Sequence, residues 1–280
     1  MTVPFVATEA GGGFELPPID HLFDFAPFLF EDSTFLALNR TGLLYLLAAF
    51  ITIGLMLAAF SNAKVVPGKL QAAMEALVEF IREGIIGAII GPQGLRYLPL
   101  LTGLFLFIAV NNFFEVMPFV QFPPTSRMAL PALLSLMVYV LFILVGLKAQ
   151  GPKYIWNAIS VPGVHWSMLI LIVPIEFVST FLLRPFTLAV RLFANMMAGH
   201  ILLAVVFLAA SYNFIDFHGL YEGVVPVVAP HGAIPFILGI FIMVGGAALV
   251  AFEILVGVLQ AYIFTMLAAV YIGSSMSPDH

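Results

Sequence analysis

The 280-residue sequence contains no cysteine and few charged residues. The lack of cysteine excludes a disulfide framework, a thiolate metal site and a cysteine nucleophile. Only 9% of the residues are charged, whereas soluble domains carry about 25%. Because so few charges cannot form an ordinary water-facing surface, a soluble enzyme is excluded. A nucleic-acid binder is excluded as well, since it would need a basic surface and the net charge here is −5.

Hydrophobic residues dominate the chain. They make up 62% of it, 28 residues are phenylalanine, and the mean hydropathy is +1.11. A helix of about 20 apolar residues crosses a hydrocarbon layer of roughly 30 Å. The sequence therefore predicts an all-α integral membrane protein with five membrane helices, at residues 41–60, 97–120, 128–147, 166–212 and 234–272.

Residues 67–92 have a different pattern, with apolar residues on one helical stripe and charged residues on the other side. Leu70, Met74 and Leu77 belong to the apolar stripe, whereas Lys69 and Glu75 are opposite. This pattern is typical of an amphipathic helix that lies in the membrane interface. The alternative is a helix on the aqueous side that packs against a partner protein.

The last two apolar segments are too long for simple spans. As continuous helices, 166–212 and 234–272 would be about 70 Å and about 58 Å long, roughly twice the hydrocarbon thickness. Each could fold back as two spans, but no cluster of turn residues divides either segment. We therefore expect two long, strongly tilted helices packed as an antiparallel hairpin. Helices this oblique imply a large protein partner alongside.

The ends of the chain and its loops predict the orientation. Residues 1–40 are acidic and lack the basic start of a leader, so we expect an external tail before a single membrane domain at 41–275. Lys and Arg are concentrated in the loops at 61–96 and 148–165. The positive-inside rule then places the N-terminus outside and the C-terminus in the cytoplasm of a bacterial cell, in a multi-pass plasma membrane protein. Seven spans would keep the same ends but would place a loop without Lys or Arg inside.

Six ionisable residues fall within the apolar segments. A charged side chain at the centre of a bilayer costs at least about 2.5–3.5 kcal/mol, so such residues indicate function unless they only stabilise packing or lie near helix ends. They are Glu115, Glu176, Arg184, Arg191, His200 and Glu253.

The spacing of the polar residues groups them further. Thr187, Arg191 and Asn195 follow at intervals of four and share one helical face, as Glu253 and Gln260 do at an interval of seven. In an antiparallel hairpin, Gln260 could lie level with Arg191, and Glu253 level with His200.

These two layers would differ in chemistry. Imidazole titrates near neutral pH, so a pair of His200 and a carboxylate can accept and pass on protons. Arg191 cannot lose its proton and stays charged. The combination favours a function in steering protons across a membrane.

Three stretches resemble subunit a of the rotary, F-type ATP synthase membrane sector. They are Leu183–His200 (LRPFTLAVRLFANMMAGH), Phe252–Ile272 (FEILVGVLQAYIFTMLAAVYI) and Asn111–Pro118 (NNFFEVMP). The resemblance covers about residues 40–275. It implies a stator subunit with two offset aqueous half-channels, which load and unload carboxylates of a rotating c-ring and couple proton flow to ATP synthesis.

The resemblance also implies partners and the roles of single residues. The partners would be the c-ring, the peripheral-stalk b subunits, the rest of the ATP synthase complex and the lipid bilayer, with no nucleic acid, no cofactor and no metal. The subunit would translocate ions without being catalytic itself. Arg191 corresponds to the essential arginine between the half-channels and Gln260 to the glutamine that faces it. His200 and Glu253 resemble the polar pair of the outer half-channel, which Asn112, Glu115 and Asn195 would also line, and Thr187 would lie at the boundary.

One position departs from the family. An acid often stands fourteen residues before the arginine, in the inner channel, but here position 177 is Phe and the acid is Glu176. A shift of one residue rotates a side chain by about 100° on a helix.

Two other functions are compatible with the residues alone. An autonomous secondary transporter or ion channel could use a mid-membrane Arg/His/Glu site, although repeat symmetry is not evident. A non-conducting scaffold subunit of a respiratory complex would leave Arg191, His200 and Glu253 dispensable.

Overall fold

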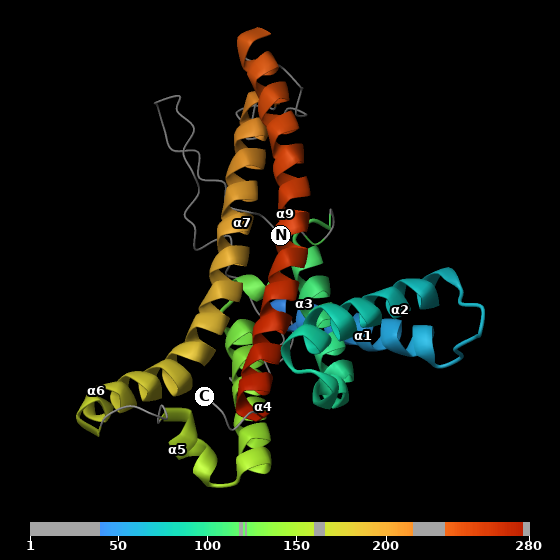
Figure 1. The fold of residues 1–280 in the computed structure, drawn as a ribbon. Helices are drawn as coiled ribbons and strands as arrows, with labels where there is room; N and C mark the ends of the chain where they lie inside the picture. Colours follow the sequence, from blue (N-terminus) through green and yellow to red (C-terminus); the bar gives the residue numbers. More distant parts are fainter. Residues whose placement is uncertain (1–39, 118–119, 121, 160–165, 215–232, 277–280) are drawn as a thin grey trace, which may run out of the picture. The chain divides into compact units, whose positions relative to one another are not determined.

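The computed structural model describes residues 40–117, 120, 122–159, 166–214 and 233–276, and the expected N-terminal tail lies outside them. The regular elements of these residues are all helical (Figure 1). The α-helices are α1 (Arg40–Phe60), α2 (Lys69–Ile81), α3 (Leu98–Phe113), α4 (Ala129–Gln150), α5 (Lys153–Ile159), α6 (Trp166–Phe177), α7 (Arg184–Phe214) and α9 (Ala233–Met276).

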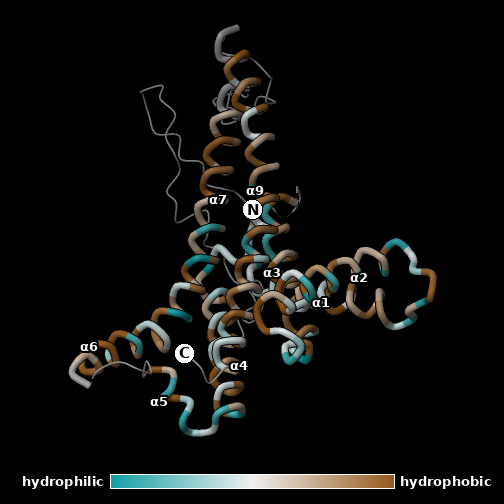
Figure 2. The backbone as a smooth tube through the Cα atoms, viewed as in Figure 1, coloured by the Kyte–Doolittle hydropathy of each residue, from teal (hydrophilic) through white to brown (hydrophobic). Residues whose placement is uncertain are grey.

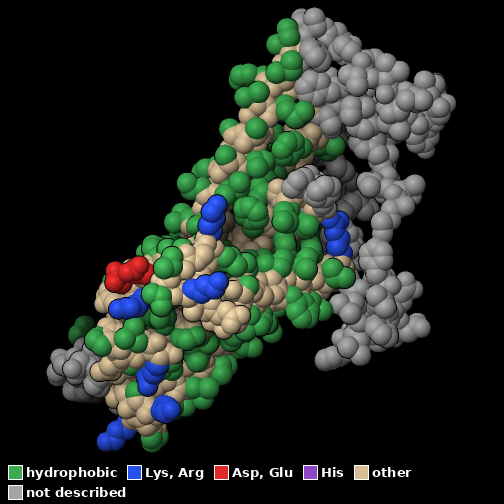
Figure 3. Space-filling view, turned by 90° about the vertical axis from the view of Figure 1, so that its right-hand side faces the viewer, with side chains coloured by type: hydrophobic (Ala, Val, Ile, Leu, Met, Phe, Trp, Pro, Cys, Tyr) green, Lys and Arg blue, Asp and Glu red, His purple; other side chains and the backbone are tan. Residues whose placement is uncertain are grey.

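Five helical stretches of the described chain are long and apolar enough to cross a membrane, which confirms the predicted all-α membrane fold. In Figure 2 most of their length is hydrophobic, and in Figure 3 the few charged side chains gather mainly toward one end of a largely hydrophobic face. The five stretches are Arg40–Phe60, Pro92–Phe113, Ala129–Gln150, Met168–Ala210 and Ile237–Met276.

Both long segments are continuous helices rather than pairs of spans. The first contains one irregularity: residues Val178–Leu183, here named the π-turn, form a π-helical stretch between α6 and α7. In the second, α9 runs for 44 residues without interruption. The tilt of these helices in a bilayer stays a prediction.

Other elements differ in detail from the expectation. The segment expected at 67–92 begins as α2 and continues as a π-helical stretch, Arg82–Gly87, before a 3-10 helix at Pro92–Tyr97 leads into α3. Helix α3 ends at Phe113 instead of residue 120, ahead of Pro118, which cannot continue a helix. The short α5 was not expected.

The chain divides into two compact units. One unit comprises residues 1–43 and 197–256, and the other comprises residues 44–196 and 257–280. Both long helices therefore contribute to both units.

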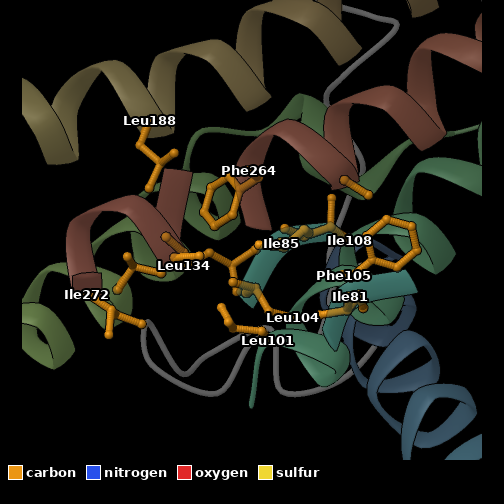
Figure 4. Close-up of a cluster of buried hydrophobic side chains, with 14 of the residues drawn as sticks. Ile81, Ile85, Leu101, Leu104, Phe105, Ile108, Leu134, Leu188, Phe264 and Ile272 are labelled. Atoms are coloured by element: carbon orange, nitrogen blue, oxygen red, sulfur yellow. The ribbon is translucent and has the colours of Figure 1, made fainter. Parts of the chain in front are cut away.

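The unit of residues 44–196 and 257–280 contains a large hydrophobic core (Figure 4). Helices α3, α4, α7 and α9 and the segment around Ile81–Ile86 all supply fully or almost fully buried side chains to it. Its members include Ile85, Leu101, Ile108, Phe142, Leu188, Leu192, Ala261, Phe264, Ala268 and Ile272.

The C-terminal end of α9 is held in this unit by Tyr154 and Gln150. The ring of Tyr154 lies against Gly146 of α4, where a larger residue would clash with it. Its hydroxyl is 3.2 Å from Ser275 Oγ, and Gln150 Nε2 donates to the Ser275 carbonyl at 3.2 Å. Burial raises the pKa of Tyr154, so its phenol stays protonated.

In the unit of residues 1–43 and 197–256, the later part of α7 packs against the earlier part of α9. A Cβ atom on Gly246 would lie 3.2 Å from Val206 Cγ1 and 3.5 Å from Phe207. A Cβ atom on Gly199 would meet the carboxyl group of Glu253. Gly199 on α7 is next to Glu253 on α9, whereas the later residues Val206 and Phe207 are next to the earlier Gly246. The two segments are therefore antiparallel within this unit.

Candidate functional site

Arg191 lies on an exposed stripe of α7. Leu183, Thr187 and Ala194 share this stripe, which we name the Arg191 stripe, and all four residues are exposed. The opposite side of the same helical turns is in the hydrophobic core, where Leu188 and Leu192 are at most 2% exposed. The guanidinium therefore projects away from the core of its own unit, among mostly apolar neighbours.

Thr187 shares the stripe but satisfies its hydroxyl locally. Its Oγ1 donates to the carbonyl of Leu183 at 2.7 Å, with Arg184 O at 3.2 Å. Such a bond back to the preceding turn is common for threonine in helices. It leaves the oxygen as an acceptor toward the outer surface of the helix.

Gln260 lies on α9 and, unlike Arg191, is buried. Its side chain is 4% exposed, and its Nε2 has no hydrogen-bond partner among the described residues. Leu192 and Ala261, the residues directly after Arg191 and Gln260, belong to the same core cluster. No hydrogen bond joins Arg191 to Gln260 within the described part of the chain. A buried amide without a partner is costly, which favours a bound water or a partner group at this point.

Glu253 and His200 lie in the other unit, where the two long helices pack together. Glu253 is 6% exposed, and its Oε2 has no hydrogen-bond partner in the described part of this unit. The carboxyl group lies against Gly199, whose missing side chain leaves room for it. His200, the next residue, is half-buried.

A buried polar cluster links the end of α3 to α9. Asn112 Nδ2 donates to the Gly257 carbonyl at 3.0 Å, and Thr125 Oγ1 donates to Asn112 Oδ1 at 3.1 Å. Glu115, three residues after Asn112, is also buried, at 5% exposure. Gly257 is needed here because a Cβ atom on it would lie 3.3 Å from Asn112 Cβ.

The remaining expected site residues are half-buried. Glu176 lies near the end of α6 and Asn195 one turn after Arg191. Arg184 starts α7 after the π-turn, and its guanidinium lies over the ring of Tyr271, 5.4 Å from the centroid.

Thr180, inside the π-turn, is only 2% exposed, and its hydroxyl has no hydrogen-bond partner among the described residues.

Some residues of this arrangement have no signal in the sequence motifs. Thr125 and Gly257 became visible only as hydrogen-bond partners of Asn112, and Thr180 only through its burial in the π-turn. Gly199 could have been suspected, because a glycine has no Cβ atom and so lets another group approach the helix backbone closely.

Comparison with known proteins agrees with these observations. The sequence profile of the family described as "ATP synthase A chain" matches residues 42–273. ATP synthase subunit a of Rhodococcus erythropolis is 37% identical over 276 residues, which cover 98% of this chain and 94% of that protein. The corresponding subunit of Streptomyces lividans is 39% identical, with coverage of 96% and 90%. That of Gluconacetobacter diazotrophicus is 33% identical, with coverage of 96% and 97%. The protein is thus a multi-pass plasma membrane subunit of the proton-translocating ATP synthase complex. The chain belongs to the ATP synthase subunit a family.

Proposed function

We propose that this chain forms two offset aqueous half-channels beside a ring of c subunits, with Arg191 as the barrier between them. One half-channel delivers protons from outside to the ring carboxylates, and the other releases them to the cytoplasm. A proton then crosses the membrane only by riding on the ring as it rotates. The expected orientation, with the N-terminus outside and the C-terminus in the cytoplasm, belongs to this proposal.

The exposure of Arg191 is the observation that carries the proposal. A guanidinium is charged at every physiological pH, and here it lies on an outward stripe of a helix that is long and apolar enough to span a membrane. Facing lipid, this charge would be costly. Facing a carboxylate in a low-dielectric gap, it would gain a strong attraction. A partner with an acidic group in the membrane, such as a c-ring, meets this requirement.

The buried polar groups fit the two access paths. Glu253 and His200 can exchange protons, and they lie on the outer side of Arg191 in the proposed orientation. Asn112 and Glu115 would extend this outer path, together with Asn195. The amide nitrogen of Gln260 has no hydrogen-bond partner among the described residues. Ala261, which follows Gln260 on α9, packs in the same hydrophobic core as Leu192, which follows Arg191 on α7. Thr187 lies on the stripe that would face the ring.

The first test replaces Arg191 by lysine in the whole complex. An ammonium can lose its proton when it is desolvated, whereas a guanidinium cannot, so Arg191→Lys should abolish proton-driven ATP synthesis in membrane vesicles. Arg82→Lys is the matched control, because Arg82 is exposed in the π-helical stretch after α2. Normal synthesis by Arg191→Lys, at normal levels of assembled complex, would refute the role of Arg191.

A second test addresses the partner. Because the chain has no cysteine, single cysteines can be introduced without background. A cysteine at Ala194 or Leu183, on the Arg191 stripe, should crosslink to a cysteine near the ring carboxylate. A cysteine at the buried Ala189 should not. Crosslinking from Ala189 alone, or proton flux through the purified chain without the ring, would favour an autonomous channel instead.

A further inference from the structure

We infer that Thr125 is a positioning residue for proton transfer: its hydroxyl fixes the direction of the Asn112 amide, which in turn holds the turn of α9 that carries Gln260. This inference rests on the proposed function, in which Asn112 lines the outer proton path. It extends that function to a residue of the loop between α3 and α4. All the residues concerned belong to the unit of residues 44–196 and 257–280.

The amide of Asn112 is bonded at both ends. Its Nδ2 donates to the Gly257 carbonyl at 3.0 Å, and its Oδ1 accepts from Thr125 Oγ1 at 3.1 Å. Asn112 and Thr125 are both buried. A buried amide oxygen without a partner is costly, so the Thr125 hydroxyl stabilises this direction of the amide over rotated ones.

The bond to Gly257 fixes one turn of α9 against the end of α3. A Cβ atom on Gly257 would lie 3.3 Å from Asn112 Cβ, so the end of α3 approaches α9 closely here (Figure 1). A helix carbonyl points toward the next turn, where it accepts from the N–H four residues later and keeps a second lone pair. The Asn112 NH2 group therefore lies against the turn from Gly257 to Ala261, which includes Gln260. A displaced Asn112 would leave this turn less fixed.

The buried loop that carries Thr125 is itself held in place. Pro123 and Pro124 restrict its backbone, and Ser126 Oγ donates to the Pro123 carbonyl at 2.7 Å. From α1, the Tyr45 hydroxyl donates to the Pro124 carbonyl at 3.1 Å. A hydroxyl on such a loop can fix the direction of an amide with little ordering cost of its own.

The alternative is that Thr125 only ties the loop to α3. Under that interpretation, loss of its hydroxyl lowers the amount of assembled complex, but each assembled complex keeps its normal proton flux at every pH. The two interpretations also differ for Tyr45, whose bond holds the same loop but does not reach Asn112.

The test uses the whole complex in inverted membrane vesicles, whose lumen corresponds to the outer side of the cell. ATP synthesis is recorded at a series of lumen pH values, while a potassium diffusion potential keeps the total driving force constant. Thr125→Val keeps the shape of the side chain but removes the hydroxyl, so it should slow synthesis per assembled complex severalfold at high lumen pH. The defect should shrink as lumen pH falls, because a higher proton concentration compensates for slow delivery. Thr125→Ser should restore both the rate and the pH profile.

The pH profile reports on proton delivery, because neither the Thr125 hydroxyl nor the Asn112 amide titrates. The charged residues next to them along the chain are Glu115 and Arg127. All variants of the test retain both, so a changed profile follows from the lost hydroxyl.

Two controls separate the direction of the amide from packing. Thr265→Val removes a fully buried hydroxyl whose bond stays within α9, to the Ala261 carbonyl at 2.8 Å. Tyr45→Phe removes the bond to the loop backbone but leaves Thr125 in place. Both should keep the wild-type rate per assembled complex and the wild-type pH profile. A wild-type profile in Thr125→Val, or the same pH-dependent defect in Tyr45→Phe, would overturn the inference.

A double variant tests whether Thr125 acts through Asn112. Asn112→Ala removes the amide, so adding Thr125→Val to it should slow synthesis no further. If the two defects multiply instead, Thr125 acts independently and the inference is wrong. If Arg191→Lys abolishes synthesis while Thr125→Val matches the wild type, only the positioning role fails. If Arg191→Lys is active, the proposed function fails first.

Discussion

Substitution of Gly199 by alanine should disturb proton uptake without preventing assembly. A Cβ atom at this position would lie 2.5 Å from Glu253 Oε2, 2.8 Å from Cδ and 3.0 Å from Oε1. Ordinary contact begins near 3.4 Å, so the carboxyl group has to move by about 1 Å. The group is the end of a flexible side chain, so this movement costs little folding free energy. For proton transfer, however, a misplacement of about 1 Å can cost up to about 100-fold in rate.

The assay compares proton flux with assembly. Vesicles that contain the Gly199→Ala complex should carry a normal amount of subunit but show slow synthesis and slow proton uptake from the outer side. Gly245→Ala is the matched control, because a Cβ atom at Gly245 meets nothing within 4 Å. It adds the same methyl group to an exposed position of α9 and should leave flux unchanged.

A second substitution tests the cause of the defect. Glu253→Asp shortens the side chain by one methylene, so in the Gly199→Ala background it should give the carboxyl group room again and recover part of the flux. If Gly199→Ala has wild-type flux, the close contact is irrelevant to proton transfer. If it fails to assemble while Gly245→Ala assembles, the glycine serves packing rather than the carboxyl position.

Two further predictions concern the rest of the structure. Asn112→Ala should lower the free energy of unfolding of the solubilised complex by about 1–3 kcal/mol more than Asn111→Ala. It removes the hydrogen bond from Asn112 to the Gly257 carbonyl and leaves the Thr125 hydroxyl without its acceptor, whereas Asn111 donates only to Phe107 O of its own helix. Equal losses in denaturant titrations would contradict the assigned hydrogen bonds. Tyr154 should make the fold sensitive to alkaline pH: its pKa is raised in the folded chain, so its stabilising contribution is complete below the ordinary tyrosine pKa of about 10 and is lost as pH rises through the raised value. Thermal unfolding between pH 9 and 11 should show this loss in the wild type but less of it in Tyr154→Phe, and identical pH profiles would exclude the effect.

The membrane helices could be predicted because their signal is local. A run such as 41–60 contains no charge, and a run of that length has few stable alternatives to a membrane helix. The continuity of 166–212 and 234–272 followed from the lack of turn residues. The polar positions Arg191, His200 and Glu253 were conspicuous because ionisable residues in apolar helices are costly.

The register and pairing of these residues could not be predicted. The π-turn, VSTFLL, is almost as apolar as the helices around it, so no periodicity reveals that one residue is inserted there. Long-range contacts such as Asn112 with Gly257 depend on packing between segments 145 residues apart. A single sequence also does not distinguish a buried polar face from one that is kept for a partner.

That last distinction bears most directly on mechanism. Glu253 is buried in its own unit, and Glu115 is buried at the end of α3, so these two carboxyl groups are covered by this chain. Arg191, which cannot lose its proton, is on the outward stripe of α7. On a membrane helix an outward charge faces lipid unless a partner covers it, and the guanidinium of Arg191 cannot be neutralised to reduce that cost, so packing within this chain alone does not explain its outward position. This arrangement is expected when the permanent charge has its counter-ion on another subunit and the titratable groups serve water-filled paths within this one.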